Sequence, residues 1–266
     1  MGRAPLGVLA ELGPGDSLGI GLAALIAGAE RYFAFDVRPF SNPAYNLRIF
    51  DELVELFRAR QPVPSQSEIV EIKPAIQDES FPSRILTNEH LEQALRSQRI
   101  RALRDALEEP GAGDHRPISY VAPWFDAALV RERTIDWIFS QAVMEHVDDL
   151  QFVYESCNKW LKPGGVMSHQ IDFRSHGTAS SWVGHRTYSD TVWRLVRGAR
   201  PYLINRQPLS EHRKLLGEIG LNLVEQDIVT ANPTIGRARL ADRFSSWSDE
   251  DLSSAGAFIV YQKETA

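Results

Sequence analysis

The chain has 266 residues, of which 43% are hydrophobic and 24% charged, and its net charge is −6. This length and hydrophobic content suffice for a full core, and the acidic balance argues against a nucleic-acid backbone as partner, because nucleic-acid-binding surfaces are basic. The single cysteine, Cys157, excludes an internal disulfide and is typical of a reducing compartment. The longest apolar stretch, residues 20–29, is too short to span a bilayer. We therefore expect a cytoplasmic protein with no membrane span.

The first elements in chain order predict half of a nucleotide-binding unit. An apolar strand over 7–12 leads into a glycine-rich loop, a small-residue helix over 20–29 and a second strand over 32–36. The glycines of the loop let a ligand approach the backbone closely. The acid at the end of the second strand, about 20 residues further on, is placed for ribose hydroxyls.

The same loop argues against a pyrophosphate cofactor. The dinucleotide pattern requires a glycine at its sixth position, and that position is Leu18 here. The acid before the first glycine, Glu11, would repel phosphate and would suit a ligand that carries positive charge.

A long insertion follows the second strand and covers residues 41–117. Its apolar spacing predicts two helices, over 46–60 and 89–107, separated and ended by proline- and glycine-containing breaks. We interpret the chain as a single domain, 1–266, in which 41–117 is a helical lid over a substrate pocket. A simple packing extension is the alternative.

The rest of the chain predicts the second half of an α/β sheet. We expect a strand over 118–122, a buried strand over 135–142, a helix capped by Asp148 over 148–161 and a strand over 166–173. A helix or extended loop over 187–196 and a helix over 210–219 follow. The last two strands are expected over 221–228 and 257–262.

Three segments carry a resemblance to a known family. The Glu11-x-Gly13-x-Gly15 loop with its later acid resembles the first two motifs of class I S-adenosylmethionine-dependent methyltransferases. Residues 135–147, which end in Glu-His-Val, are similar to the family's fourth-strand motif, and 161–165 resemble the turn before its fifth strand. The resemblance implies an α/β fold: a seven-stranded Rossmann-like methyltransferase sheet with helices on both faces, a helical insertion after strand 2, and the last two strands as an antiparallel hairpin at the edge.

The resemblance also implies S-adenosyl-L-methionine as the cofactor and a set of cofactor-binding positions. These are Glu11, Gly13, Gly15, Asp36, Val37, Ala122, Trp124, Ser140 and Gln141. The family usually has Asp or Asn near Ala122 for the adenine amine. A backbone contact at Ala122 or stacking by Trp124 would replace that side chain, although Trp124 is equally explained as a core residue.

Polar residues after the fifth strand are candidates for activating an acceptor. We expect His169, His146 and Asp172 to be catalytic, since a hydroxyl acceptor benefits from a base and histidine titrates near neutral pH. Strand alternation puts His169 and Asp172 on opposite sides, so they are not expected to form one pair. For each of these three residues, a purely structural role is the alternative to a catalytic one. A metal site of His and Asp is the alternative, but no dense ligand spacing supports it, so we assign no metal ligands.

The loop-rich stretch that follows combines arginines with aromatic residues, which suits an anionic or sugar-like acceptor but is also common in surface loops. The candidate substrate-binding residues are His176, Arg174, Tyr188, Trp193 and Arg206.

These residues also resemble, more distantly, bacterial methyltransferases near glycan and surface-polysaccharide biosynthesis. We therefore expect an O-methyltransferase with a sugar hydroxyl as the first choice of acceptor and a small natural-product or lipid-like hydroxyl or carboxylate as the second. A nicotinamide-dependent oxidoreductase and a non-catalytic binding protein that kept the fold remain as alternatives. The sequence does not give the oligomeric state.

Overall fold

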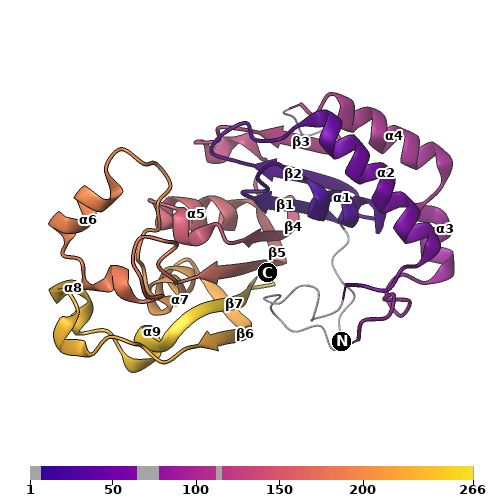
Figure 1. The fold of residues 1–266 in the computed structure, drawn as a ribbon. Coiled ribbons are helices and arrows are strands. Elements are labelled where there is room, and N and C mark those ends of the chain that lie inside the picture. Colours follow the sequence, from indigo (N-terminus) through magenta and orange to yellow (C-terminus); the bar gives the residue numbers. More distant parts are fainter. Residues whose placement is uncertain (1–6, 65–77, 112–115, 266) are drawn as a thin grey trace. The chain divides into compact units, whose positions relative to one another are not determined.

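The computed structural model describes residues 7–64, 78–111 and 116–265. Seven strands form one sheet in the order β3-β2-β1-β4-β5-β7-β6, which confirms the expected seven-stranded α/β fold with its last two strands as neighbours at one edge (Figure 1). The chain divides into two compact units, 1–140 with 156–167 and 263–266, and 141–155 with 168–262. Within the described ranges, no helix is long and apolar enough to cross a membrane.

The strands are β1 Val8–Leu12, β2 Arg31–Phe35, β3 Ile118–Val121, β4 Ile135–Gln141, β5 Leu161–Asp172, β6 Leu221–Thr230 and β7 Ser254–Lys263. The α-helices are α1 Gly19–Ile26, α2 Pro43–Ala59, α3 Asn88–Ala94, α4 Ser97–Glu108, α5 Leu150–Trp160, α6 Asp190–Arg197, α7 Leu209–Glu218, α8 Asp242–Ser245 and α9 Asp249–Ser253. Short 3₁₀ turns are η1 Ala127–Leu129, η2 Met144–His146, η3 Gly184–Thr187 and η4 Arg237–Arg239.

In the first unit, β1 pairs in parallel with β2 and β4, and β2 pairs in parallel with β3. Side chains alternate between the two faces of β2. Tyr32 and Ala34 join the core that α1, α2 and α4 cover, whereas Phe35 stacks at 4.8 Å on Trp160 at the end of α5. Helical residues therefore cover both faces of this part of the sheet, as expected.

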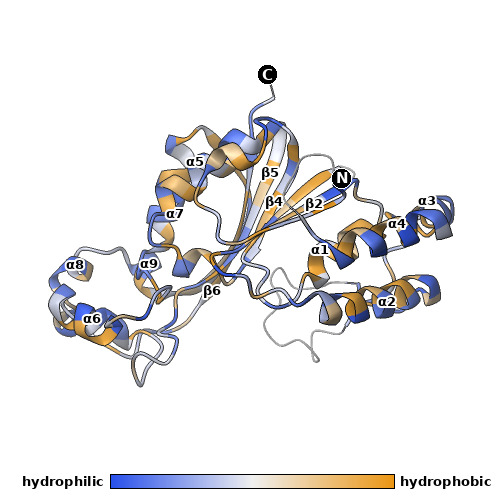
Figure 2. Cartoon of the chain, turned by 90° about the horizontal axis from the view of Figure 1, so that it is seen from above, coloured by the Kyte–Doolittle hydropathy of each residue, from blue (hydrophilic) through white to orange (hydrophobic). Residues whose placement is uncertain are grey.

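The helices of the predicted insertion belong to the core of the first unit. Phe50 and Val54 of α2 and Leu103 and Leu107 of α4 are all buried in the cluster that contains the apolar residues of α1. Figure 2 shows hydrophobic and hydrophilic residues alternating along α2, as expected for a helix with one buried face. This packing accounts for both predicted helical stripes. The lid function of 41–117 stays a prediction, and residues 65–77 and 112–115 of that segment lie outside the described residues.

Several predicted boundaries differ from the structure. The single helix expected over 89–107 is two helices, α3 and α4, which are separated at Leu95 and Arg96. β5 begins at Leu161, inside the segment expected to be a turn before the strand. Glu145 and His146 lie in the short turn η2, and the helix expected from residue 148 begins at Leu150 as α5. The side chain of Asp149, not Asp148, accepts the capping hydrogen bond, from the Phe152 amide at 2.9 Å. Asp148 pairs with Arg197 instead, at 2.7 Å. In the second unit, the region predicted as a helix or extended loop contains α6, capped by the Ser189 hydroxyl.

Candidate active site

The glycine loop of the first unit leaves its backbone open to a ligand. Gly13 and Gly15 have φ values of +66° and +71°, a left-handed conformation that favours glycine. The Gly13 amide donates to the Phe35 carbonyl at 2.8 Å, which ties the loop to the end of β2. Nothing lies within 4 Å of the position that a Cβ of Gly15 would take. A cofactor can therefore approach the backbone at this point.

Asp36 holds this loop in place. Its carboxylate accepts hydrogen bonds from the amides of Gly15, at 3.0 Å, and Val37, at 2.7 Å, and the residue is only 4% exposed. A carboxylate has about four lone-pair sites, so two remain for other donors. Its binding to ribose hydroxyls stays a prediction, which this position directly after β2 accommodates.

Glu11 lies beneath α1. It accepts a hydrogen bond from the Tyr32 hydroxyl and another from the Gly21 backbone. Burial raises the pKa of Glu11 to about 7, so the carboxyl group is partly protonated at neutral pH. A Cβ on Gly21 would lie 2.0 Å from the Tyr32 ring, so the ring fits only because this residue is a glycine. The contacts favour a structural role for Glu11 over the predicted contact with the cofactor.

At the predicted adenine-binding positions, the side chain and the backbone of Trp124 have different surroundings. Trp124 is 8% exposed and packs against Phe35 and Trp160 at 5.6 and 5.4 Å, so its ring belongs to an aromatic core cluster. The Trp124 amide donates to the Asp36 carbonyl at 3.2 Å, which places the backbone two residues after Ala122 beside Asp36. This favours the core interpretation of the Trp124 side chain. Ser140, at the end of β4, is buried.

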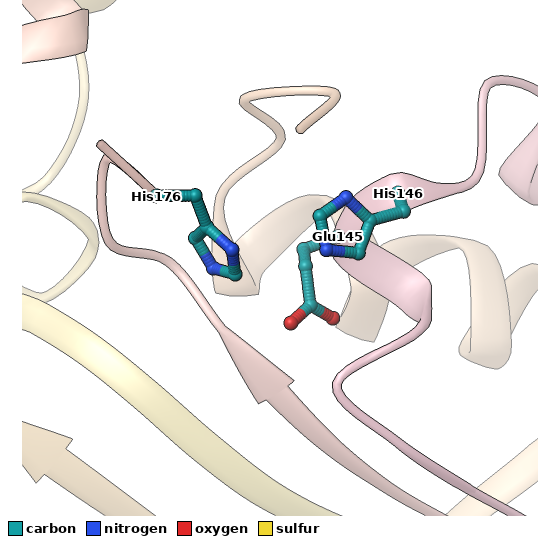
Figure 3. A group of neighbouring side chains, drawn as sticks. All are labelled: Glu145, His146 and His176. Carbon is teal, nitrogen blue, oxygen red and sulfur yellow. The ribbon is translucent and has the colours of Figure 1, made fainter. Parts of the chain in front are cut away.

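Three side chains of the second unit converge on one point. Glu145 and His146 project from the turn η2, and His176 comes from the loop after β5 (Figure 3). One ligand-type atom of each lies within 4.8 Å of the others. The two imidazole rings meet edge to face, with their centroids 5.0 Å apart. Residues far apart in sequence thus form one polar cluster, which we call the η2 cluster: Glu145, His146, Asp172 and His176.

Asn205 fixes the shape of the turn that supports this cluster. Its amide nitrogen Nδ2 donates to the carbonyls of Met144 and Val147, each at 2.8 Å, and its backbone amide donates to the Glu145 carbonyl. The Glu145 carboxylate in turn accepts from the Asp172 amide at 3.2 Å. The cluster is therefore held by hydrogen bonds that join three segments: the turn η2, the end of β5 and the segment of Asn205.

The η2 cluster contains buried polar atoms that have no hydrogen-bond partner. These are Oε2 of Glu145 and Nδ1 of His146. Glu145 is 3% exposed, and burial raises the pKa of its carboxyl group to about 7. Burial, with the nearby His176, lowers the pKa of His146, so its imidazole is neutral at pH 7.

Asp172 and His176 form a pair within the cluster. The His176 Nε2 lies 3.4 Å from the Asp172 Oδ2, and this contact raises the pKa of the histidine. Burial would raise the pKa of Asp172, but the hydrogen bonds from His176 and from the Arg174 amide hold it below its usual value. His176 has a left-handed φ of 46°, so the backbone is strained at this position.

His169 does not fit its predicted role as the general base. It is 1% exposed, packs on the Tyr154 ring at 5.6 Å, and burial lowers its pKa to about 3. Such an imidazole does not take up a proton near neutral pH. As expected from strand alternation, His169 shares its buried side with Ile171, and Asp172 lies on the other.

The predicted substrate-binding residues after β5 have partners within the protein. Arg206 is 4% exposed, donates to the Tyr188 carbonyl at 2.8 Å and to Asp190 at 2.9 Å, and lies over the Trp193 ring at 4.4 Å. The Tyr188 hydroxyl donates to the Thr178 carbonyl. These contacts favour a structural role for Arg206, Trp193 and Tyr188, which leaves His176 as the predicted substrate-side residue that joins the cluster.

Glu145 is the member of the cluster that sequence reasoning did not single out. It was visible in the Glu145-His146-Val147 motif, but a motif does not reveal that its carboxylate turns inward toward His176. That orientation depends on the segment of Asn205, about sixty residues further along the chain.

Part of the chain matches known proteins in sequence. Residues 89–168, from α3 into β5, match the family model described as a methyltransferase domain. A curated ubiquinone biosynthesis O-methyltransferase from Rhizobium rhizogenes is 28% identical over 138 residues, which are 52% of this chain and 52% of that protein. The aligned part of the chain thus spans about half the length of this relative.

Solved structures are similar at low identity. A putative sarcosine dimethylglycine methyltransferase from Galdieria sulphuraria has 13% identity and a TM-score of 0.48, over 97% of this chain and 78% of that one. An S-adenosylmethionine-dependent methyltransferase from Mesorhizobium loti has 12% identity and a TM-score of 0.45, over 96% of this chain and 90% of that one.

Proposed function

We propose that this chain, which carries a class I S-adenosylmethionine-dependent methyltransferase domain, transfers a methyl group from S-adenosylmethionine to a hydroxyl of a small acceptor. The observation that carries the proposal is the η2 cluster, in which two imidazoles and two carboxylates gather around buried polar atoms without partners. The methyltransferase match favours this reading over a nicotinamide-dependent oxidoreductase or a binding protein without activity.

The chemistry explains why such a cluster points to a hydroxyl. An oxygen lone pair of the acceptor attacks the methyl carbon, the carbon–sulfur bond breaks, and sulfur keeps the electron pair as neutral S-adenosylhomocysteine. The acceptor proton must leave as the new bond forms. A carboxylate acceptor has no proton to lose, whereas an alcohol ionises far above neutral pH and needs a base or a cation. Histidines and carboxylates can act as the base, and they can also bind the cation.

The cofactor would lie on the glycine loop of the first unit. Gly13 and Gly15 leave the backbone accessible, and the two remaining lone-pair sites of Asp36 suit a ribose diol. This chain's own residues would bind and orient the donor there, because alignment supplies much of the rate of an in-line transfer.

The acceptor class is part of the proposal. We retain a sugar hydroxyl, as in surface-polysaccharide biosynthesis in the cytoplasm, as the first class, because an aliphatic hydroxyl is the acceptor that most needs a cluster of this kind. The relative named for ubiquinone biosynthesis is an O-methyltransferase, which supports oxygen as the methylated atom. A phenolic or lipid-like hydroxyl is the second class.

The test is transfer of a deuterated methyl group to a panel of acceptors. We would incubate the full chain with methyl-deuterated S-adenosylmethionine and sugars, phenols or carboxylic acids, and then locate the label by mass spectrometry. We expect the label on a hydroxyl oxygen. Asp172→Asn should lower turnover, and Asp148→Asn, an exposed carboxylate in the same unit that pairs with Arg197, should not. A label confined to nitrogen or carboxylate would overturn the proposal.

A further inference from the structure

We propose that Glu145, His146 and His176 form a binding site for one divalent transition-metal ion, and that Asp172 positions His176 for it. This inference deepens the proposed function and rests on it for the role of the ion, which would bind the acceptor's hydroxyl oxygen. It departs from the expectation of no metal, because the three ligands are brought together by the fold and not by their spacing in sequence.

The donor set and its geometry suit such an ion. One ligand atom of each residue lies within 4.8 Å of the other two. Metal bonds to imidazole nitrogen or carboxylate oxygen of about 2.0–2.2 Å place neighbouring ligand atoms roughly 3–3.5 Å apart. The side chains therefore need to close by about an ångström. The His176 side chain, 25% exposed, has room for this movement.

Two of the three ligands present a buried polar atom that nothing in the described structure satisfies. Oε2 of Glu145 and Nδ1 of His146 both lack a hydrogen-bond partner. Buried polar atoms are normally paired, and each exception calls for an explanation such as a missing ion. Glu145 is 97% buried, so its orphan oxygen is not simply hydrated at the surface.

Each proposed ligand also makes one contact with the protein and keeps its other polar atom for the ion. Oε1 of Glu145 accepts from the Asp172 amide, His146 makes a backbone hydrogen bond with Tyr202, and Nε2 of His176 lies 3.4 Å from the Asp172 carboxylate. Metal-binding histidines characteristically donate their second N–H to a carboxylate or a backbone carbonyl, which fixes the ring and its tautomer. The η2 cluster has this arrangement at both histidines.

The chemistry of the three ligands indicates which kind of ion the site would bind and what that ion would do. Two imidazoles and one carboxylate favour Zn²⁺, Mn²⁺ or Fe²⁺ over Mg²⁺, which prefers oxygen ligands and retains water. Three protein ligands leave coordination positions open for an acceptor. An ion held there would lower the pKa of a bound hydroxyl, so that its proton could pass to water at neutral pH while Asp172 keeps His176 in position.

The test measures ion binding without any methylation. The full chain is stripped with EDTA, desalted, and titrated with Zn²⁺ by calorimetry and with Co²⁺ by visible absorption, in the absence of cofactor and acceptor. We expect one equivalent to bind and Mg²⁺ to bind far more weakly. Glu145→Gln and His176→Ala should weaken binding at least tenfold, and Asp172→Asn about 10–100-fold. Asp148→Asn removes a nearby exposed charge and should leave affinity unchanged.

The possible outcomes distinguish failure of the metal site from failure of the proposed function. A wild-type chain that binds neither Zn²⁺ nor Co²⁺, or variants that bind them normally with native circular dichroism spectra, would overturn the site. O-methylation that persists in the EDTA-stripped chain would reject the role of the ion in the reaction while leaving the proposed function intact. Stoichiometric binding lost in the ligand variants supports the site even in a chain that methylates no hydroxyl, a result that would reject the proposed function alone.

Discussion

The hydroxyl of Tyr32 on β2 donates a hydrogen bond to the carboxylate of Glu11 on the adjacent strand β1, inside a core where the two residues are 1% and 4% exposed. Burial raises the pKa of Glu11 to about 7, and it raises the pKa of Tyr32 as well. The protein therefore keeps an acid in an apolar layer, directly before the loop expected to bind the cofactor.

This pair predicts a pH-dependent stability. The folded pKa of Glu11 lies above its unfolded value of 4.5, so the folded chain binds more protons than the unfolded chain between these pH values. The resulting stabilisation is fully present below pH 4.5 and is lost as the pH rises through about 7, a change on the order of 3 kcal/mol. Glu11→Gln should remove this loss, because its amide stays neutral while its oxygen still accepts from Tyr32.

Urea unfolding of the cofactor-free protein at pH 5 and pH 8 checks this prediction. We expect Glu11→Gln to be more stable than the natural chain at pH 8 and to lose that advantage at pH 5. Glu92→Gln, an exposed acid on α3, is the matched control and should change neither value. An equal destabilisation of Glu11→Gln at both pH values would contradict the shifted pKa.

Asp36 is predicted to bind the ribose of the cofactor while it holds the glycine loop. Asp36→Ala should weaken binding of S-adenosylhomocysteine by about 1–3 kcal/mol, because the amides of Gly15 and Val37 lose their acceptor and the ribose hydroxyls lose theirs. Calorimetry measures this directly. Asp105→Asn, an exposed acid on α4, should bind normally. Unchanged affinity in a folded Asp36→Ala protein would exclude the ribose role.

Arg206 is predicted to stabilise the second unit and not to contact the acceptor. Arg206→Met removes hydrogen bonds to Tyr188 and Asp190 and the cation over the Trp193 ring, and should lower the unfolding free energy by about 1–3 kcal/mol. Arg243→Met breaks an exposed contact with the same Asp190 and should cost less than about 1 kcal/mol. An Arg206→Met protein of normal stability with a raised KM for the acceptor would restore the substrate-binding interpretation.

His146 and His169 should differ sharply when they are replaced. His169→Phe keeps a ring in the buried position beside Tyr154, so it should lower the melting temperature but leave turnover of the folded protein within a few-fold. His146→Gln removes a member of the η2 cluster and should lower turnover about 10²–10⁴-fold. The measurement is kcat per folded molecule at saturating cofactor. A large loss in His169→Phe alone would return the base to His169.

The motifs of the sequence predicted the sheet because each depends on local pattern. Alternating or continuous apolar runs gave all seven strands, and the glycines at 13 and 15 marked a left-handed loop that few other residues can form. The helical stripe over 46–60 was correct as the helix α2, whereas the stripe over 89–107 is divided between the two helices α3 and α4. Their burial against α1, however, depends on shape complementarity between distant segments, which periodicity does not report.

The sequence alone thus determined the fold class, the glycine loop after β1 and the polar segment after β5, because spacing along one strand, helix or turn encodes them. Only the tertiary structure decided which polar residues meet. It buried His169 against the Tyr154 ring, placed Arg206 over the Trp193 ring, and brought Glu145, His146 and His176 together at a turn that Asn205 holds. Which polar residues are buried and which meet depends on contacts with residues tens of positions away, and these contacts form only when the chain packs.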